Sequence, residues 1–492
     1  MEVLSRKCGA FRVALVLLAL ALLLPAGGSR VCAAPEGRVV FDGPKAGNLE
    51  DLTLRILAAM EARLRLDLVS PAGEPRSEPL RTRLIHLSMQ EPLAEATRMT
   101  LQLLGGSKRA RYALFFLMPA VRWMSEPFLY PVELSSDPEK RNREMQKVFD
   151  RIAFLQREEG ISATLDNVGD AALSPEAARD YLDYYLKLAR AFGNTPGTEL
   201  CFSLKLSAFS YQLDKALGAG KEAGEKRAEI LGALRQLLSA AAAAPDKRIF
   251  FRLDMEEYAY KDLTLSLFRQ AVEADPDLAL APDGSLRLGV VIQAYLRDSA
   301  KDLEGLAQWA RERNIRVPVR LVKGAYEKHE KALARQQGRA KSPVYNFKAS
   351  TDACYEALSA YLLANRDAFD PAFATHNLRT MAHVMALARI MEIAPGDAEF
   401  QMLYGMGDPI KEIVVGLGYP MREYIPAGSL ARGLGYAGRR FAELASGDNA
   451  LARTMRGDFS AVDQGAPSFT GPEDVADGRL CLMLATESLD KR

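Results

Sequence analysis

The stretch IFFRLDM, residues 249–255, sets two charged residues, Arg252 and Asp254, among apolar ones. A short run of this kind, rich in aromatic and branched side chains, predicts a buried strand of a parallel sheet. Similar runs recur along the chain, and a helical stretch separates each from the next. The others are SATLDN (162–167), LCFSLKL (200–206), LGVVIQA (288–294), VPVRLVKG (317–324), AFATHN (372–377), EFQMLYGM (399–406) and MREYIPAG (421–428).

These alternating strand and helix units predict a (β/α)8 barrel of the TIM type, which we assign to residues 151–445. An open doubly wound sheet is the alternative fold. One helix between strands is clearly delimited in SPEAARDYLDYYLKLARAFG. Ser174 is placed to cap it, Pro175 lies in its first turn and Gly193 follows its last turn.

The first 34 residues have the layout of a secretory signal peptide. Basic residues precede an apolar run at 13–24, and small residues follow it. That run is shorter than the roughly 20 residues of a membrane span. A membrane-tethering segment and a start codon placed too far upstream are the alternatives, so we leave residues 1–34 out of the fold.

The segments that flank the barrel differ from it in pattern. Residues 35–150 are predicted to form a helical arm or cap, for dimerisation or for packing on the barrel. Its helices are NLEDLTLRILAAMEARLRLDL (48–68), capped by Asn48, and the dense apolar ARYALFFLMPAVRWM (110–124). Residues 446–492 are polar and rich in Gly, Pro and Asp, which predicts a mostly disordered tail. The apolar RLCLMLATESLD (479–490) is a short element that could dock.

The composition of the chain narrows the classes of function to consider. Lys and Arg number 64 against 63 Asp and Glu, which leaves no basic footprint for nucleic acid and favours a small-molecule partner. The wide spacing of the cysteines predicts neither a disulfide framework nor a zinc knuckle, and suits a reducing compartment. HEKAL at His329 lacks the second histidine of a zinc motif, because Leu333 stands there. The five cysteines are Cys8, Cys32, Cys201, Cys354 and Cys481.

Polar side chains end the predicted strands. Chemistry in such barrels lies at the carboxyl ends of the strands, and a charge buried there is costly unless it is paired or used. Each residue also has a structural explanation: Asp254 could pair with Arg252, and His376 could be a satisfied interior histidine. Lys323 could be a Schiff-base nucleophile. The set comprises Asp166, Lys205, Asp254, Gln293, Arg320, Lys323, Thr375, His376, Asn377 and Tyr424.

The stretch GLGYAGRR, residues 433–440, spells G-x-G-x-x-G. That pattern binds a dinucleotide only where a strand has just ended and a helix begins. A helix predicted from Ser429 places these glycines inside it, so we interpret them as packing residues. Tyr436, Arg439, Arg440 and Glu443 share one face of that helix. Two adjacent guanidiniums suit a carboxylate, and a solvated basic pair is the alternative.

Several motifs in register resemble the proline dehydrogenase flavoenzymes, most closely the proline dehydrogenase portion of bifunctional bacterial proline utilisation enzymes. The resemblance runs from about residue 150 to 445. It implies FAD bound without covalent linkage, oxidation of L-proline to Δ1-pyrroline-5-carboxylate, and transfer of electrons to a membrane quinone. It rests on TLDNVGDAALS (164–174), SLKLSAF (203–209), VVIQAY (290–295), VRLVKGAY (319–326), FATHN (373–377), FQMLYGMG (400–407), YIPAG (424–428) and YAGRRFAE (436–443).

The resemblance also implies residue roles. The carboxylate of the substrate would be held by Lys205, Arg439 and Arg440. Tyr326, Tyr436 and Leu403 would shape the pocket, and Asp254 would orient Tyr424. Gln293 and Arg320 would reach the isoalloxazine ring, and Glu443 would lie near the cofactor and pair with an arginine. The rest of FAD would be bound by Val322, Lys323, Gly324, Thr375, His376 and Asn377.

Some positions refine the expectation. Glu327 stands where the bifunctional enzymes carry Trp, and Tyr436 goes with proline rather than hydroxyproline in that family. We expect a cytoplasmic protein at the membrane surface, with export or tethering through residues 1–34 as the alternative. A separate chain would carry the downstream pyrroline-5-carboxylate dehydrogenase, and homo-oligomerisation stays open. The competing functions are a Schiff-base lyase that uses Lys323 and a non-catalytic binding barrel.

Overall fold

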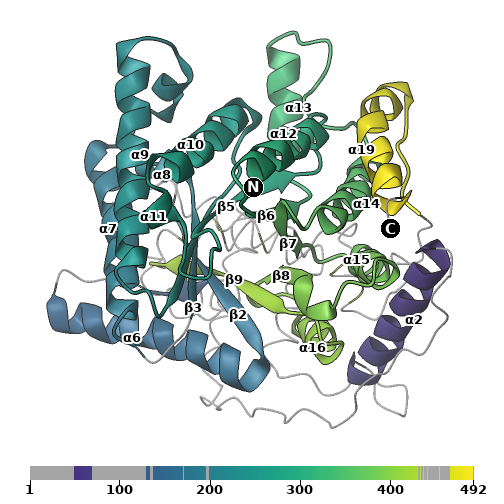
Figure 1. The fold of residues 1–492 in the computed structure, drawn as a ribbon, viewed down its shortest axis with the longest axis horizontal. Coiled ribbons are helices and arrows are strands. Elements are labelled where there is room, and N and C mark those ends of the chain that lie inside the picture. Colours follow the sequence, from purple (N-terminus) through teal and green to yellow (C-terminus); the bar gives the residue numbers. More distant parts are fainter. Residues whose placement is uncertain are drawn as a thin grey trace, which may run out of the picture.

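A computed structural model describes residues 49–68, 129–132, 137–169, 171–195, 199–429 and 466–490, with single positions 433, 436, 440, 451 and 454. Its centre is a closed barrel of parallel strands, ringed by helices (Figure 1). The barrel strands are β2 (Ile161–Asn167), β3 (Glu199–Leu204), β4 (Arg248–Leu253), β5 (Leu288–Gln293), β6 (Val317–Val322), β7 (Phe369–Ala374), β8 (Glu399–Leu403) and β9 (Met421–Gly428).

Closure of the sheet decides between the two predicted folds. β9 pairs in parallel with β8 on one side and with β2 on the other, where Leu165 lies opposite Ile425. A doubly wound sheet has two free edges, so the barrel prediction is confirmed and the alternative is excluded. Each predicted strand has its counterpart in the barrel. A short additional strand, β1 (Tyr130–Pro131), extends the edge of β9 beyond the barrel.

Helices cover the outside of the barrel between successive strands. Ser174 caps α7, accepting a hydrogen bond from the Ala177 amide at 3.2 Å, as its sequence predicts. The main outer helices are α7 (Pro175–Phe192), α9 (Lys221–Ala242), α10 (Lys261–Ala274), α12 (Ser299–Glu312), α14 (Lys348–Ala364), α15 (Leu378–Ile390) and α16 (Asp408–Gly416). Shorter ones are α8 (Leu206–Phe209), η2 (Leu213–Leu217), η3 (Tyr258–Tyr260), α11 (Pro276–Ala279), α13 (Glu327–Gln336) and η4 (Pro395–Asp397).

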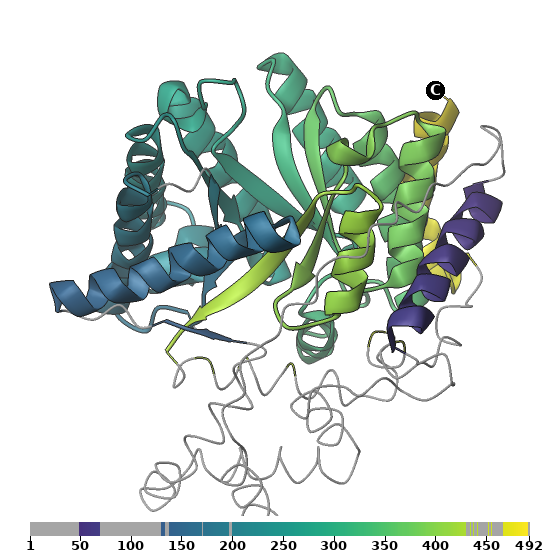
Figure 2. The same cartoon turned by 90° about the horizontal axis from the view of Figure 1, so that it is seen from below.

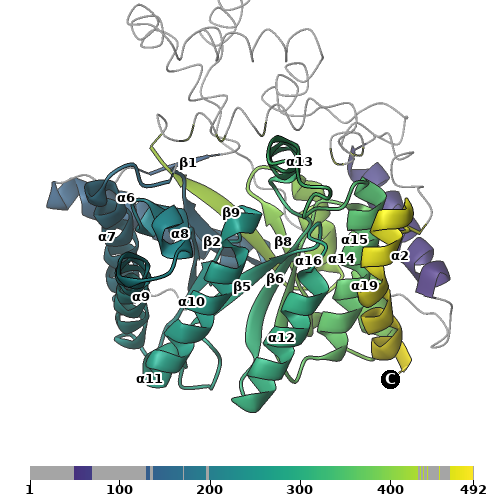
Figure 3. The same cartoon turned by 90° about the horizontal axis from the view of Figure 1, so that it is seen from above.

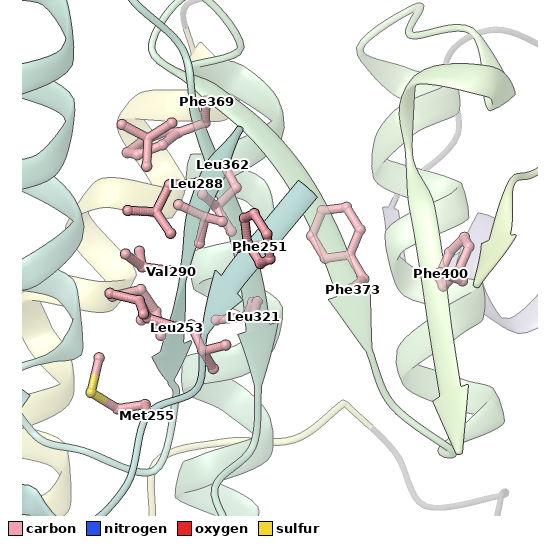
Figure 4. Close-up of a cluster of buried hydrophobic side chains, with 14 of the residues drawn as sticks. Phe251, Leu253, Met255, Leu288, Val290, Leu321, Leu362, Phe369, Phe373 and Phe400 are labelled. Carbon is pink, nitrogen blue, oxygen red and sulfur yellow. The ribbon is translucent and has the colours of Figure 1, made fainter. Parts of the chain in front are cut away.

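Alternation along each strand separates an apolar outside from a polar inside. Outward side chains such as Phe251 and Leu253 of β4 belong to the same buried hydrophobic cluster as Leu362 of the outer helix α14 (Figure 4). Burying a side chain of this size stabilises the fold by about 1.5–3 kcal/mol relative to its exposure. The intervening residues, Arg252 among them, point into the barrel, because successive side chains of a strand face opposite ways.

The lower half of the barrel interior is held by charge. Arg422 of β9 donates to Glu199 at 3.0 Å and to Glu399 at 2.8 Å, so it joins β3, β8 and β9. Burial opposes the ionisation of Glu399, but Arg422 outweighs it and lowers the pKa of that carboxyl to about 2. This end therefore supports the barrel rather than the chemistry, as expected for the amino-terminal end of the strands.

The amino-terminal region supplies two helices that the structure describes. The predicted helix at 48–68 is α2 (Leu49–Leu68), which lies against α15 (Figure 2). Arg379 of α15 donates two hydrogen bonds, of 2.8 and 2.9 Å, to Glu50 of α2. Asn48 and the apolar stretch at 110–124 lie outside the described residues. The helix α6 (Pro138–Phe154) continues into a π-helical turn, η1 (Leu155–Glu159), and runs through the assigned boundary at residue 151.

The carboxyl-terminal region contains the apolar element at 479–490 that the sequence indicates could dock. It lies within the helix α19 (Pro472–Asp490), which begins before the predicted element and lies along α14 (Figure 3). The buried carboxylate of Asp474 explains the difference, because it accepts hydrogen bonds from the Asn346 and Phe347 amides at 2.9 and 3.2 Å. Tertiary contacts thus order a segment whose composition predicts disorder.

Two further findings concern membranes and thiols. Among the described helices, none combines the length and the apolar character that a membrane crossing requires. Cys201, Cys354 and Cys481 are free thiols, but the Sγ atoms of Cys354 and Cys481 lie only 2.8 Å apart. Their separation of 127 positions along the chain hid this contact from the sequence.

Gly289 tests the tightness of the barrel interior. A Cβ there would lie 2.5 Å from the Pro318 carbonyl oxygen and 2.8 Å from the Phe250 ring. We expect Gly289→Ala to lower the free energy of unfolding by about 1–3 kcal/mol through overpacking. Gly232→Ala is the matched control, because α9 leaves open space at that position and alanine favours a helix by up to about 1 kcal/mol. Urea unfolding measures both, and a Gly289→Ala protein of unchanged stability would contradict the packing.

Candidate active site

The Asp254 carboxylate organises the carboxyl end of the barrel. It follows β4 and accepts hydrogen bonds from side chains of three other strands. Ser203 Oγ of β3 donates to Oδ1 at 2.9 Å, Tyr424 of β9 donates to Oδ2 at 3.0 Å, and Arg320 of β6 forms a close ion pair with Oδ1. The guanidinium of Arg320 also lies over the Tyr424 ring, 5.2 Å from its centroid. Burial raises the pKa of Tyr424 well above its usual range, so this phenol stays a neutral donor.

Arg320 is fixed by further contacts. Its Nη2 donates to Ser203 Oγ at 3.0 Å and its Nη1 to Gln401 Oε1 at 3.3 Å. Only 5% of the side chain is exposed, and its buried Nε has no hydrogen-bond partner among the described residues. The sequence predicted Arg320, Asp254 and Tyr424 but missed Ser203 and Gln401. Ser203 and Gln401 alternate in phase with the inward-facing residues of their strands, and this alternation could have indicated them.

Lys205 forms a second buried ion pair at this end. Its Nζ lies 2.7 and 2.8 Å from the two oxygens of Asp166, the residue before the last one of β2. Burial opposes the charge on Lys205, but Asp166 outweighs it and raises the pKa of the ammonium. Lys205 therefore stays a cation at neutral pH and remains 24% exposed. A cation held in this way binds anions and cannot act as a base.

The helix that follows β9 is described at three positions. Gly433 is helical, and a Cβ there would lie 2.1 Å from Leu129, so this glycine of the G-x-G-x-x-G pattern permits packing, as predicted. Arg440 lies over the Tyr436 ring, 5.0 Å from its centroid, as expected for one helical face. Burial raises the pKa of the Tyr436 phenol, and the positive charges of Arg440 and Lys205 oppose that shift. Arg439 and Glu443 lie outside the described residues.

The loop after β7 carries three predicted residues with structural partners. His376 Nε2 accepts the Leu403 amide at 3.0 Å, which places the ring proton on Nδ1. Burial, with Lys411 and Arg440 nearby, lowers the pKa of His376 to about 3, so the ring is neutral. Asn377 caps α15 by accepting the Thr380 amide at 3.0 Å. Thr375 Oγ1 in turn accepts the Asn377 amide at 3.1 Å.

The loop after β6 brings a lysine and a glycine to the same end. Lys323 Nζ lies 2.5 Å from Asp352 of α14, a partner that no motif in the sequence indicates. Burial lowers the pKa of Lys323, and Asp352 opposes that shift. Gly324 has a φ of +132°, and a Cβ there would lie 2.5 Å from the Tyr295 ring. Only glycine fits at this position. The preceding Val322 is half-buried at the end of β6.

Gln293 and Tyr326 complete the set of predicted residues. Gln293 is buried at the end of β5 and donates to the Glu256 carbonyl at 3.0 Å. The Glu256 side chain, also missed by the sequence, accepts the Ser207 amide at 2.9 Å, and burial raises its pKa. Tyr326 precedes α13, and burial raises the pKa of its phenol to about 12. Its nearby charges are Glu256 and Lys205, which places Tyr326 beside the Lys205 pair.

Asp166→Asn would leave the Lys205 cation without its counter-charge. We expect this substitution to lower the free energy of unfolding by about 3 kcal/mol, the lower end of the cost of breaking a buried ion pair. The control Asp367→Asn disrupts an exposed pair, with Arg311 Nε 2.7 Å from Asp367, and should cost less than about 1 kcal/mol. Urea unfolding measures both variants. Equal decreases in the free energy of unfolding would show that the Lys205–Asp166 pair contributes no more than an exposed ion pair.

The fold and the site together define a class: parallel (β/α)8 barrels with a charged, partly buried site at the carboxyl ends of the strands. A family model described as "Proline dehydrogenase" matches residues 150–453, more than half of the chain. The chain therefore belongs to the proline dehydrogenase family, as its motifs predict.

Named relatives agree with this assignment. The chain is 33% identical over 297 residues to "Bifunctional protein PutA" of Klebsiella aerogenes, which covers 58% of this chain and 22% of that protein. It is 29% identical to "Proline dehydrogenase 1" of Bacillus subtilis, over 55% of this chain and 74% of that protein. The crystal structure of PutA from Bdellovibrio bacteriovorus inactivated by N-propargylglycine aligns with a TM-score of 0.66 at 27% identity, over 89% of this chain and 44% of that chain. The chain thus spans less than half the length of the two PutA proteins just named.

Proposed function

We propose that this protein oxidises L-proline to Δ1-pyrroline-5-carboxylate with FAD as cofactor. The observation that carries the proposal is the Lys205 ammonium, held by Asp166 beside the Tyr436–Arg440 pair. Two cations at one mouth of a barrel suit a small carboxylate, and an aromatic ring beside them suits a compact apolar ring such as that of proline. Family membership points to the same substrate.

The residues at the carboxyl end fit a flavin. Arg320 offers a buried N–H without a partner among the described residues, and Lys323 lies nearby with a depressed pKa. Arg320 and Gln293 would hold the ring system, and Val322, Lys323, Gly324, Thr375, His376 and Asn377 would line the remainder. Of these, Asn377 is committed to its helix cap through its side chain. FAD, when bound, supplies the hydride acceptor for this class of oxidation.

The protein side chains would orient the substrate and exclude water. Lys205 and Arg440, joined by Arg439, would clamp the carboxylate and so decide which ring carbon reacts. Tyr424, locked by Asp254, and Leu403 would form the walls of the pocket. The amine proton would pass to solvent, because Lys205 is already protonated and Asp254 is occupied by three donors. Electrons would pass to a membrane quinone at the surface of the membrane, and a separate dehydrogenase would consume the product.

The visible spectrum of the purified full-length protein tests cofactor and substrate together. We expect a flavin band that bleaches when L-proline is added without oxygen, because the substrate reduces the cofactor. D-proline is the control, since its carboxylate has the opposite configuration, and clamping it directs the ring away from the position that the ring of L-proline occupies. A protein that stays colourless after incubation with FAD would overturn the proposal. It would favour a lyase in which the Lys323 amine attacks a carbonyl, and borohydride would then trap the substrate on Lys323.

Arg440→Met tests the clamp separately. We expect the KM for L-proline to rise by roughly 100-fold, a loss of about 2.7 kcal/mol of binding, while the flavin band remains. Arg179→Met is the control, because Arg179 is exposed on α7 and pairs only with the exposed Glu176 among the described residues. Steady-state kinetics with a soluble quinone analogue gives both values. An unchanged KM with bound flavin would remove Arg440 from substrate binding.

A further inference from the structure

The helix α19 is docked on the barrel by charged side chains. Asp474 accepts the Asn346 and Phe347 amides and pairs with Arg297 at 2.9 Å. Arg297 also reaches Asp477 of α19 at 2.6 Å and lies over the Tyr345 ring. These contacts hold α19 in register without any contribution from sulfur. The thiol of Cys481 is therefore brought to a fixed place on α14.

That place is occupied by a second thiol. Cys354 of α14 and Cys481 of α19 are both fully buried, and their Sγ atoms lie 2.8 Å apart. Ser299 Oγ lies 3.6 Å from Cys354 Sγ, and Tyr345 OH lies 3.7 Å from Cys481 Sγ. A disulfide needs a separation of about 2.05 Å, so an approach of less than about 1 Å would join them.

The surroundings make the two thiols unequal. Burial raises the pKa of the Cys354 thiol well above its usual range. A hydrogen bond from Cys354 lowers the pKa of the Cys481 thiol. Cys481 is therefore the thiol that ionises first and attacks an oxidant, and Cys354 is the one that resolves the product.

We propose that Cys354 and Cys481 form a redox modification site, where a reversible disulfide locks α19 onto the barrel. A low-molecular-weight disulfide such as oxidised glutathione is the oxidant. The Cys481 thiolate attacks one of its sulfurs and releases one thiol, which leaves a mixed disulfide. Cys354 then loses its proton, attacks the Cys481 sulfur and releases the second thiol. Two protein thiols are oxidised, and one small disulfide is reduced to two thiols.

Burial of the pair sets the rate of this exchange. Neither sulfur is exposed while α19 is docked, so the oxidant reaches Cys481 only when the helix opens locally. Once formed, the disulfide closes a loop of 127 residues and opposes that opening. The oxidised protein should therefore hold α19 more firmly than the reduced protein. This inference does not depend on the oxidation of proline.

The test compares the full-length protein after equilibration with oxidised glutathione and with dithiothreitol. Free thiols are alkylated and the peptides are mapped by mass spectrometry. We expect a peptide that links Cys354 to Cys481 in the oxidised sample alone. Amide hydrogen exchange in α19 should be slower in that sample by at least about tenfold. Full alkylation of both cysteines after oxidation, or linkage of Cys481 to another cysteine, would overturn the proposal.

Variants distinguish the effect of the Cys354–Cys481 disulfide on α19 from a general effect of oxidation. Cys354→Ser should abolish the slowing of exchange in α19. Cys201→Ser should retain it, because Cys201 lies inside the barrel, 3.2 Å from Arg422. Where a variant fails to fold, the wild-type comparison decides alone. If amide hydrogen exchange in α19 is equally fast in the oxidised and reduced wild-type protein, the disulfide does not lock α19, even if the linked peptide is found.

Discussion

The ion pair between Asp254 and Arg320 is the interaction on which the upper half of the barrel depends. Removing two charges from water costs several kcal/mol each, and the pair repays this only when the remaining hydrogen-bonding capacity is filled. Ser203 and Tyr424 fill the capacity of Asp254, while Ser203 and Gln401 engage Arg320. One carboxylate thus fixes the relative positions of β3, β4, β6 and β9 at the end where the chemistry is placed.

The pattern of the sequence sufficed for the barrel, and it indicated several of the polar residues that converge at the carboxyl ends of the strands. IFFRLDM contains both signals, since Phe251 and Leu253 pack outside the barrel while Asp254 reaches its mouth. The period of two separates the two faces of a strand, and one residue more or fewer would exchange them. The pairing of Lys205 with Asp166 was less accessible, because it depends on the register of β2 and β3, in which Asp166 lies opposite Ser203.

Partners supplied by helices could not be predicted in this way. Asp352 meets Lys323 from α14, and Asp474 meets the Asn346 and Phe347 amides from α19. Neither carboxylate belongs to a motif, and the composition around Asp474 indicates disorder. A single buried acceptor that satisfies two backbone amides outweighs that average composition, since each unmade hydrogen bond would cost about 1–3 kcal/mol. Local propensity failed where one specific tertiary contact decided the outcome.

The strand β8 shows how stability and chemistry share one barrel. Its inward residues are Glu399, Gln401 and Leu403, from bottom to top. The Gln401 oxygen accepts from Arg320 while its amide nitrogen donates to Glu399 at 2.6 Å, so the amide has only one satisfactory orientation. Glu399 in turn is held by Arg422. The charge cluster of Glu399 and Arg422 therefore orients Gln401, which in turn accepts a hydrogen bond from Arg320. A substitution at the amino-terminal end of the barrel would thus change the position of Arg320 through this one side chain.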